Sequence, residues 1–420
     1  MPNDTIRALI FDYGGVLMRT VDPRPRRDLE RRLELEPGDV YHLVFHSPRW
    51  GEVQQGQIDS ETFWAHVAQG LSLDEGQLAR FRRAFWAGDR LDEDLVNLIR
   101  DLRQEGYRTA LLSNAPSDMR AFLEELEIDD AFDVIVISGE EGVVKPSPQI
   151  YHRTLDRLGV APREAVFVDD MQVNVDAASE VGLHGTRFRG LAPLKVWLED
   201  LGVSVPDPTP DPVAEVEAVI FDWGGVMEEL PSDTDVARWE GRLAVASGVL
   251  PEVLWGEAWR RLEIGAISDE EYVELVALRL DLPDEAAALH FLQRFYTTDR
   301  LNHEVLDAAR ALRDRYRVGL LSNAFPSQAE VVQRYHGIDL EAEFDVYVNS
   351  ALVGVSKPNP DIYRLALQRL GVEPQRAIFL DDNLRNVDAA CALGVHAIQF
   401  VNPRVSLSRL EELLGHPILS

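Results

Sequence analysis

The stretch Phe11-Asp12-Tyr13-Gly14-Gly15-Val16 recurs almost unchanged as Phe221-Asp222-Trp223-Gly224-Gly225-Val226. In each copy a short apolar run leads directly into the aspartate. A short apolar run of this kind is typical of a strand that is buried on both faces of a sheet. The stretch therefore predicts a buried strand that carries an aspartate at its carboxyl end, twice in one chain.

Three further motifs recur after it in the same order. Leu111-Leu112-Ser113-Asn114-Ala115 returns as Leu320-Leu321-Ser322-Asn323-Ala324, and Asp169-Asp170 returns as Asp381-Asp382. Between them, each half has a Lys-Pro pair, at Lys145 and at Lys357. The second aspartate of the pair follows the lysine by 25 residues in both halves. This repeat is far too long for a solenoid, so it indicates duplication of a whole domain.

The two lysines stand out because the chain otherwise uses arginine. Of 42 lysines and arginines, only Lys145, Lys195 and Lys357 are lysine. A compact ammonium can make a point contact in a tight site where a planar guanidinium does not fit. The matched positions therefore indicate a site that needs an ammonium.

The repeats divide the chain into residues 1–204 and 215–420. Prolines alternate along the connecting residues 205–214, in Val205-Pro206-Asp207-Pro208-Thr209-Pro210-Asp211-Pro212. Alternating proline favours an extended polyproline II conformation, so we expect a semi-rigid linker.

Each half alternates strand and helix patterns. Helical patterns such as Ser147–Leu158 and Val173–Val181 separate short apolar runs. The predicted strands of the first half are Ala8–Phe11, Thr109–Leu112, Val134–Ile137 and Ala165–Val168. Such alternation predicts a parallel sheet with right-handed crossovers, and open sheets of this class bind ligands at the carboxyl ends of their strands.

A long helical segment separates the first two motifs in each half. Helical patterns cover Ser60–Leu71 and Asp269–Leu280, and each follows a similar start, Gly56-Gln57-Ile58-Asp59 or Gly265-Ala266-Ile267-Ser268. Ser268 and Glu271 have the spacing of a capping box. We expect these segments, roughly 18–95 and 228–303, to form helical caps above the strand ends.

Composition limits the class of partner. The net charge of −30 argues against nucleic-acid binding, which needs a basic surface, and it also disfavours anionic membranes. No stretch approaches the roughly 20 apolar residues that span a bilayer, and the N-terminus lacks a signal-peptide layout, so we expect a cytoplasmic protein. The single cysteine, Cys391, is expected in a helix core. The arginines at 24, 26 and 27 could contact a substrate anion, but a solvated face of the cap is the favoured interpretation.

With these motifs in order, each half resembles a complete member of the haloacid dehalogenase-like hydrolase superfamily, of the kind with a helical cap after the first strand. The resemblance covers nearly the whole chain. It implies an α/β fold of two tandem Rossmann-like parallel-sheet domains, each with a cap inserted after the first strand. Related single-domain proteins often pair, so we expect the halves to pack as an intramolecular pseudo-dimer.

The resemblance also implies roles for the repeated residues. Asp12 and Asp222 are expected to attack phosphorus and form an aspartyl-phosphate. The residues expected to bind Mg²⁺ are Asp12, Gly14 (through its carbonyl) and Asp170 in the first half, and Asp222, Gly224 (likewise) and Asp382 in the second. Ser113 and Ser322 are expected to donate to the phosphoryl group, and Lys145 and Lys357 to neutralise it. Asn114 and Asn323 are expected to bind substrate at the mouth facing the cap. Asp169 and Asp381 are expected to support the site, through a water on the metal or by orienting the lysine.

One departure concerns the acid that phosphatases of this superfamily usually carry two residues after the nucleophile. That position is Gly14 in one half and Gly224 in the other. General acid–base help contributes roughly 10²–10⁴-fold, so a substrate with a good leaving group is favoured. We expect a Mg²⁺-dependent phosphomonoester hydrolase acting on a small phosphorylated metabolite such as a sugar phosphate. Two other interpretations stay open: a catalytically silent binding or scaffold protein, and a haloacid dehalogenase, whose halide leaving group needs no proton.

Overall fold

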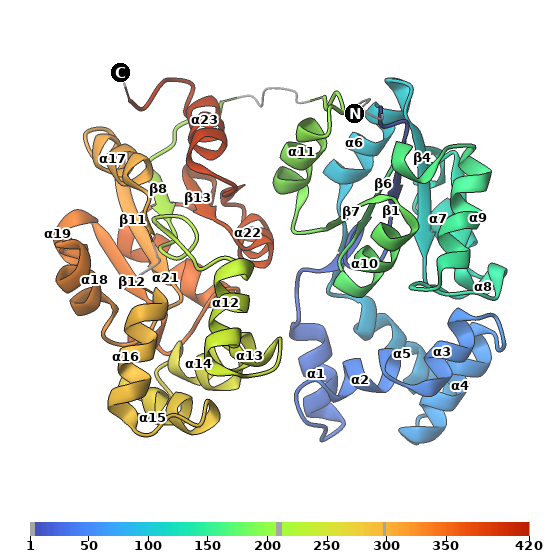
Figure 1. The fold of residues 1–420 in the computed structure, drawn as a ribbon, viewed down its shortest axis with the longest axis horizontal. Helices are drawn as coiled ribbons and strands as arrows, with labels where there is room; N and C mark the ends of the chain where they lie inside the picture. Colours follow the sequence, from blue (N-terminus) through green and yellow to red (C-terminus); the bar gives the residue numbers. More distant parts are fainter. Residues whose placement is uncertain (1–4, 207–211, 297–299, 420) are drawn as a thin grey trace. The chain divides into compact units, whose positions relative to one another are not determined.

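The computed structural model describes residues 5–206, 212–296 and 300–419. The chain forms two compact units, Met1–Pro208 and Thr209–Ser420 (Figure 1). The central part of the predicted linker, residues 207–211, lies outside the described residues.

Unit 1 is built on a five-stranded sheet with the order β5-β4-β1-β6-β7, in which every neighbouring pair is parallel. The strands are β1 (Ala8–Phe11), β4 (Arg108–Ser113), β5 (Val134–Ile137), β6 (Ala165–Asp169) and β7 (His184–Arg187). The four predicted strands are confirmed to within one residue at each end, and β7 was not predicted. The helices of this part are α6 (Glu93–Gln104), α7 (Met119–Glu125), α8 (Ser138–Glu141), α9 (Pro148–Leu158), α10 (Gln172–Val181) and α11 (Leu191–Asp200).

Unit 2 repeats this plan with the strand order β12-β11-β8-β13-β14, again all parallel. Its strands are β8 (Ala218–Phe221), β11 (Arg317–Ser322), β12 (Val346–Asn349), β13 (Ala377–Asp381) and β14 (His396–Gln399). Its helices outside the cap are α17 (His303–Leu312), α18 (Gln328–His336), α19 (Leu340–Glu343), α20 (Ser350–Val353), α21 (Pro360–Leu370), α22 (Leu384–Cys391) and α23 (Pro403–Leu414). The predicted pair of Rossmann-like α/β domains is therefore confirmed.

The alternation of side chains along the central strand divides each core into two layers. In β8, Val219 and Phe221 pack against helices α17, α18 and α23, whereas Ala218 and Ile220 pack against α21 and α22. All four side chains are almost completely buried. A strand covered by helices on both faces has no solvent-exposed side, which explains its uninterrupted apolar sequence.

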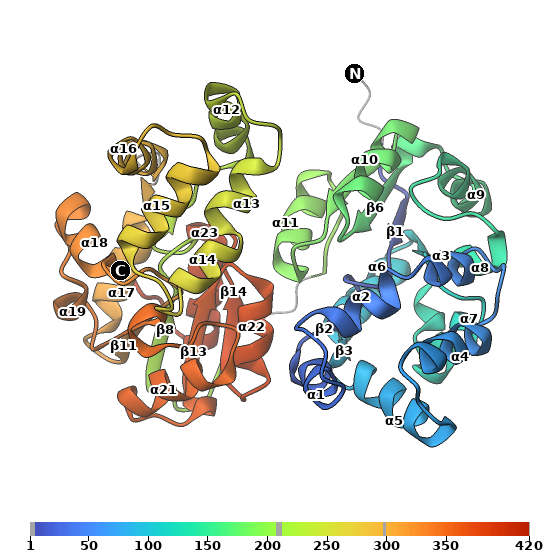
Figure 2. The same ribbon diagram turned by 90° about the horizontal axis from the view of Figure 1, so that it is seen from below.

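Each unit has a helical cap inserted after the first strand. In unit 1 an antiparallel ribbon of β2 (Met18–Thr20) and β3 (Asp89–Leu91) forms the base of the cap. The helices between these two strands are α1 (Arg24–Arg32), α2 (Asp39–Phe45), α3 (Pro48–Gln54), α4 (Ser60–Gly70) and α5 (Glu75–Trp86). In Figure 1 the cap helices of unit 1 lie at one end of its sheet, and in Figure 2, which is seen from below, they lie in front of it.

The cap of unit 2 follows the same order. Its ribbon pairs β9 (Glu228–Glu229) with β10 (Arg300–Leu301). Its helices are α12 (Asp233–Leu243), α13 (Val249–Trp255), α14 (Glu257–Leu262), α15 (Asp269–Arg279) and α16 (Glu285–Tyr296). The predicted capping box at the start of α15 is confirmed, because Ser268 and Glu271 bond reciprocally to each other's backbone.

Two predictions about single residues are wrong. Cys391 is exposed at the end of α22, because that helix buries the face formed by Val387, Ala389 and Ala390. Arg26 does not lie on a solvated face: its side chain is only 12% exposed and bonds Asp89 at the base of the cap at 2.8 Å.

In the described parts of the chain, no helix has the length and apolar character needed to cross a membrane.

Candidate active site

The motif residues of unit 1 meet at the carboxyl edge of its sheet. Asp12 follows β1, Ser113 ends β4 and Asp169 ends β6. Because β1 pairs in parallel with both β4 and β6, these three strand ends are neighbours. The same register brings Asp222, Ser322 and Asp381 together in unit 2.

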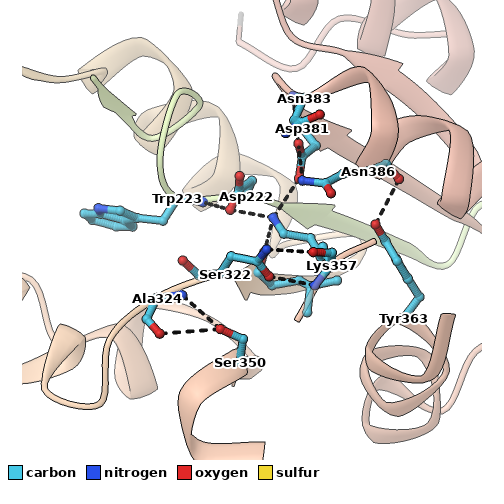
Figure 3. A network of polar contacts seen from close by, with 12 residues as sticks. Asp222, Trp223, Ser322, Ala324, Ser350, Lys357, Tyr363, Asp381, Asn383 and Asn386 are labelled. Carbon is cyan, nitrogen blue, oxygen red and sulfur yellow. Dashed lines mark hydrogen bonds and ion pairs between the residues drawn. The ribbon is translucent and has the colours of Figure 1, made fainter. Parts of the chain in front are cut away.

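A buried lysine joins two carboxylates in each unit. Lys145 Nζ lies 2.7 Å from Asp12 Oδ1 and 2.7 Å from Asp169 Oδ2, and its side chain is 1% exposed. In unit 2, Lys357 Nζ lies 2.7 Å from Asp222 Oδ1 and 2.6 Å from Asp381 Oδ2 (Figure 3). The matched lysines of the sequence thus occupy equivalent central positions.

Burial and charge act in opposite directions in this cluster. Burial favours the neutral form of each group, whereas each carboxylate stabilises the ammonium and is stabilised by it. For Lys145 burial lowers the pKa, but Asp12 and Asp169 outweigh it and raise the pKa above its ordinary value. For Asp12 burial dominates and raises the pKa to about 7, although Lys145 opposes it. The lysine therefore stays charged at neutral pH.

Asp169 is fully occupied by contacts within the protein. Its Oδ1 accepts hydrogen bonds from the Met171 backbone at 2.8 Å and from Asn174 Nδ2 at 3.0 Å, while Oδ2 accepts from Lys145. The residue is completely buried. Of the two roles expected for it, this geometry favours orientation of the lysine.

Asn174 lies five residues after Asp169 and was given no role in the sequence analysis. It holds Asp169, and its own backbone carbonyl accepts from the Tyr151 hydroxyl at 2.9 Å. Asn386 and Tyr363 repeat this arrangement around Asp381 in unit 2 (Figure 3). The signal that could have identified these residues is their identical recurrence in both halves.

Asn114 contacts the lysine segment. Its Nδ2 donates to the Lys145 carbonyl at 2.9 Å, and its Oδ1 accepts from the Lys145 backbone at 2.8 Å. Asn323 makes the same two bonds to the backbone of Lys357. The asparagines therefore position the lysine, and their contact with substrate remains a prediction.

The acidic residues of each unit fit a divalent metal. Carboxylate oxygens of Asp12, Asp169 and Asp170 lie within 4.8 Å of one another, and those of Asp222, Asp381 and Asp382 do the same. Burial, followed by the charge of Asp169, raises the pKa of Asp170, so a cation bound beside it would stabilise its charged form. Hard oxygen ligands are those that Mg²⁺ prefers.

The loop glycines allow this approach of the acids. Gly15 has φ +77°, and a Cβ built there would lie 2.3 Å from Asp170 Cγ. Gly225, also at φ +77°, would place a Cβ 2.4 Å from Asp382 Cγ. Any side chain at these positions would displace the acid, so the glycines keep that space open.

The positions that lack the usual acid have room for one. Nothing lies within 4 Å of a Cβ at Gly14, and at Gly224 only Leu230 atoms come near, at 3.6 and 3.9 Å. Neither residue has a positive φ. The backbone would therefore accept an aspartate at both positions, and the carboxyl group is missing only because the sequence has glycine there.

The cap contributes residues that the motifs did not identify. Gln54, at the end of α3, donates from Nε2 to the Asn114 carbonyl at 2.9 Å. At the matched place in unit 2, Glu263 Oε1 accepts from Ser356 Oγ at 3.1 Å, next to Lys357. Burial raises the pKa of Glu263. These residues join each cap to the edge of its sheet.

The family model of haloacid dehalogenase-like hydrolases matches residues 6–182 and again residues 216–394. Acyl-CoA dehydrogenase family member 10 from Mus musculus is 31% identical over 207 residues, which cover 48% of this chain and 19% of that protein. The sesquiterpene phosphatase astK from Aspergillus oryzae is 29% identical over 182 residues, covering 43% of this chain and 89% of that protein.

Among solved structures, a haloacid dehalogenase family enzyme from Bacteroides thetaiotaomicron, in complex with magnesium and inorganic phosphate, is 22% identical with a TM-score of 0.37. It matches 43% of this chain and 93% of that one. The chain spans only about a fifth of the mouse protein but most of the fungal one. Because the family model matches both halves, the chain belongs to the haloacid dehalogenase-like hydrolases, with two such domains in tandem.

Proposed function

We propose that each unit is a Mg²⁺-dependent phosphomonoester hydrolase that acts through an aspartyl-phosphate on a small phosphorylated metabolite. The observation that carries the proposal is the buried ammonium of Lys145, 2.7 Å from the carboxylate of Asp12, with the same contact between Lys357 and Asp222. A carboxylate that attacks a phosphate dianion is repelled by it, and a fixed cation at the nucleophile offsets that repulsion. The name of the fungal relative, a sesquiterpene phosphatase, supports the same reaction class.

The reaction has two displacements at phosphorus. An oxygen of Asp12 forms a bond to phosphorus as the bond from phosphorus to the leaving oxygen breaks, and the electron pair leaves with that oxygen. Asp12 Oδ1 already accepts from the Tyr13 backbone and from Lys145, both at 2.7 Å, so Oδ2 is the better placed nucleophile. Water then attacks the acyl phosphate, which releases inorganic phosphate and restores the carboxylate.

Asp12, the Gly14 carbonyl and Asp170 would hold the Mg²⁺ ion in unit 1. Asp222, the Gly224 carbonyl and Asp382 would hold it in unit 2. When bound, the ion would neutralise charge on the phosphoryl oxygens. Asp169 is held away from this task by its own hydrogen bonds, and it keeps Lys145 directed at Asp12. Ser113, buried at the end of β4, would donate a hydrogen bond from its hydroxyl group to a phosphoryl oxygen.

The chain's own residues restrict the leaving group. With Gly14 and Gly224 in place of an acid, negative charge builds up on the departing oxygen. Substrates whose leaving group is a weak base, such as sugar 1-phosphates or acyl phosphates, are therefore favoured over simple alkyl phosphates.

A screen of phosphorylated metabolites for phosphate release, with and without Mg²⁺, tests the proposal. We expect release that depends on Mg²⁺ and disappears in the double variant Asp12→Asn/Asp222→Asn. Parallel incubation with 2-haloacids separates the reaction classes: halide release without Mg²⁺ and no phosphate release would overturn the proposal.

A further inference from the structure

Unit 2 has a buried chain of polar side chains behind Ser322. Gln328 is the first residue of α18, and Tyr347 and Asn349 belong to β12, the strand that pairs with the strand of Ser322. Gln328, Asn349 and Ser322 are between 2% and 4% exposed. Burial of polar side chains costs free energy unless each of them forms hydrogen bonds inside the protein. The partners of these residues are therefore informative.

Unit 1 has an apolar counterpart at the same places. Met119 is the first residue of α7 and is buried there, as Gln328 is in α18. Ile135 and Ile137 pair with β4 in the same register as Tyr347 and Asn349 pair with β11. The two units therefore differ in the support of an otherwise equivalent serine.

The distances form one continuous chain. Asn349 Nδ2 lies 2.9 Å from the Tyr347 hydroxyl, that hydroxyl lies 2.9 Å from Gln328 Oε1, and Gln328 Nε2 lies 3.0 Å from Ser322 Oγ. The far end is attached to the backbone: Asn349 Oδ1 accepts from the Ala351 N–H at 2.9 Å, and Nδ2 also donates to the Phe325 carbonyl at 3.0 Å.

These backbone contacts fix the direction of every hydrogen bond in the chain. A backbone N–H can only donate and a carbonyl can only accept, so the orientation of the Asn349 amide is determined. Its Nδ2 donates to the Tyr347 oxygen, and the Tyr347 proton then goes to Gln328 Oε1. Burial raises the pKa of Tyr347 to about 12, so this proton is present at neutral pH. Gln328 must therefore donate to Ser322 Oγ.

The consequence concerns the proton of Ser322. A hydroxyl that accepts from Gln328 on one side has its own proton free for another partner. We propose that Gln328, supported by Tyr347 and Asn349, is a positioning residue that fixes the Ser322 hydroxyl as a hydrogen-bond donor to the phosphoryl group. The two sites are then unequal: the serine of unit 2 is preorganised as a donor, whereas Ser113 has Met119 and isoleucines at the matched positions. The inference rests on the proposed function.

The test is a double-mutant cycle in the Asp12→Asn protein, where only unit 2 can turn over. The four forms carry wild-type unit 2, Gln328→Met, Ser322→Ala, and both changes. Methionine is the residue that unit 1 has at this place. The readouts are hydrolysis of p-nitrophenyl phosphate and calorimetric binding of inorganic phosphate, both with Mg²⁺, together with the melting temperature of each form.

We expect Gln328→Met to lower kcat/KM and phosphate affinity by about tenfold when Ser322 is present, because the hydroxyl is no longer held as a donor. In the Ser322→Ala background the same change should have no effect on either quantity. Tyr347→Phe should give a smaller loss, because it removes one link and leaves Gln328 in place.

Equal losses in the serine and alanine backgrounds would overturn the inference, since they would show a structural role only. An unchanged phosphate affinity in Gln328→Met would also overturn it. If the Asp12→Asn protein with wild-type unit 2 binds phosphate but hydrolyses no phosphomonoester, the proposed function fails for unit 2. The phosphate-binding cycle then still decides the role of Gln328.

Discussion

Loss of the buried ammonium should destabilise one unit by a predictable amount. In Lys357→Met, the carboxylates of Asp222 and Asp381 lose a partner that lies 2.7 and 2.6 Å away, while both stay buried. Removal of one partner from a buried ion pair costs about 3–5 kcal/mol, because the remaining charge has no compensation. For a domain of about 200 residues each kcal/mol lowers Tm by about 2–4 °C, so we expect the transition of unit 2 to fall by roughly 6–20 °C at pH 8.

The size of this effect should depend on pH in a defined direction. Burial raises the pKa of Asp222 well above its ordinary value, and Lys357 opposes this rise. Loss of the ammonium should therefore let Asp222 keep, in the folded state, a proton that the unfolded chain releases. The folded state then binds more protons than the unfolded one, so stability falls as the pH rises. The loss of stability caused by Lys357→Met should therefore be smaller at pH 5 than at pH 8.

Differential scanning calorimetry of the full chain is the assay, with the transition of unit 1 as the internal reference. The double variant Lys357→Met/Asp381→Asn should recover part of the loss, because one of the uncompensated charges is removed. Lys357→Arg should keep more stability than Lys357→Met but lose turnover, since a guanidinium does not fit where three oxygens converge on one nitrogen. A fall of less than about 2 °C at pH 8 in Lys357→Met would refute the reasoning.

Three other outcomes are expected. Asp12→Asn and Asp222→Asn should each remove part of the phosphatase activity and of the Mg²⁺-induced rise in Tm, and full activity of the wild type after chelation would contradict a metal site. Rates for aryl phosphates should fall steeply as the phenol becomes more basic, and Gly14→Asp, measured with Asp222→Asn, should flatten that slope; a flat slope in the native enzyme would contradict this. Glu263→Gln, which installs the residue type of Gln54, should raise the Tm of unit 2 at pH 8 but not at pH 4, because the raised pKa of Glu263 makes its charged form unfavourable in the folded state. An equal rise in Tm at pH 4 and pH 8 would show that the stabilisation comes from packing and not from removal of the charge.

The fold and the centre of each site follow from local sequence. Continuous apolar runs such as Ala8–Phe11 mark strands covered on both faces, and the residue after the run marks the catalytic edge. The duplication supplied a second indication of the site residues, because Lys145 and Lys357 occupy matched positions in the two halves of one chain. Both lysines form an ion pair with the aspartate after the first strand, and their role toward a phosphoryl group stays a prediction.

The remaining residues depend on neighbours that are distant in sequence. Gln328 reads as an ordinary polar residue at a helix start, and only the packing of α18 against β12 brings it to Tyr347. Glu263 and Gln54 differ between the halves, so repetition could not reveal them. Cys391 was placed wrongly because its apolar neighbours suggested a core, although the helix turns it to the outer side.

The presence of two complete residue sets in one polypeptide has a consequence for dosage. Two separate enzymes can be made in different amounts, but these two sites are always synthesised in a one-to-one ratio. At equal substrate concentrations, a difference in the flux through them must then come from their rate constants and affinities. The proposal for Gln328 would make its replacement by Met119 in the other unit one source of such a difference. Substitution at such positions would then be one means of adjusting one site relative to the other.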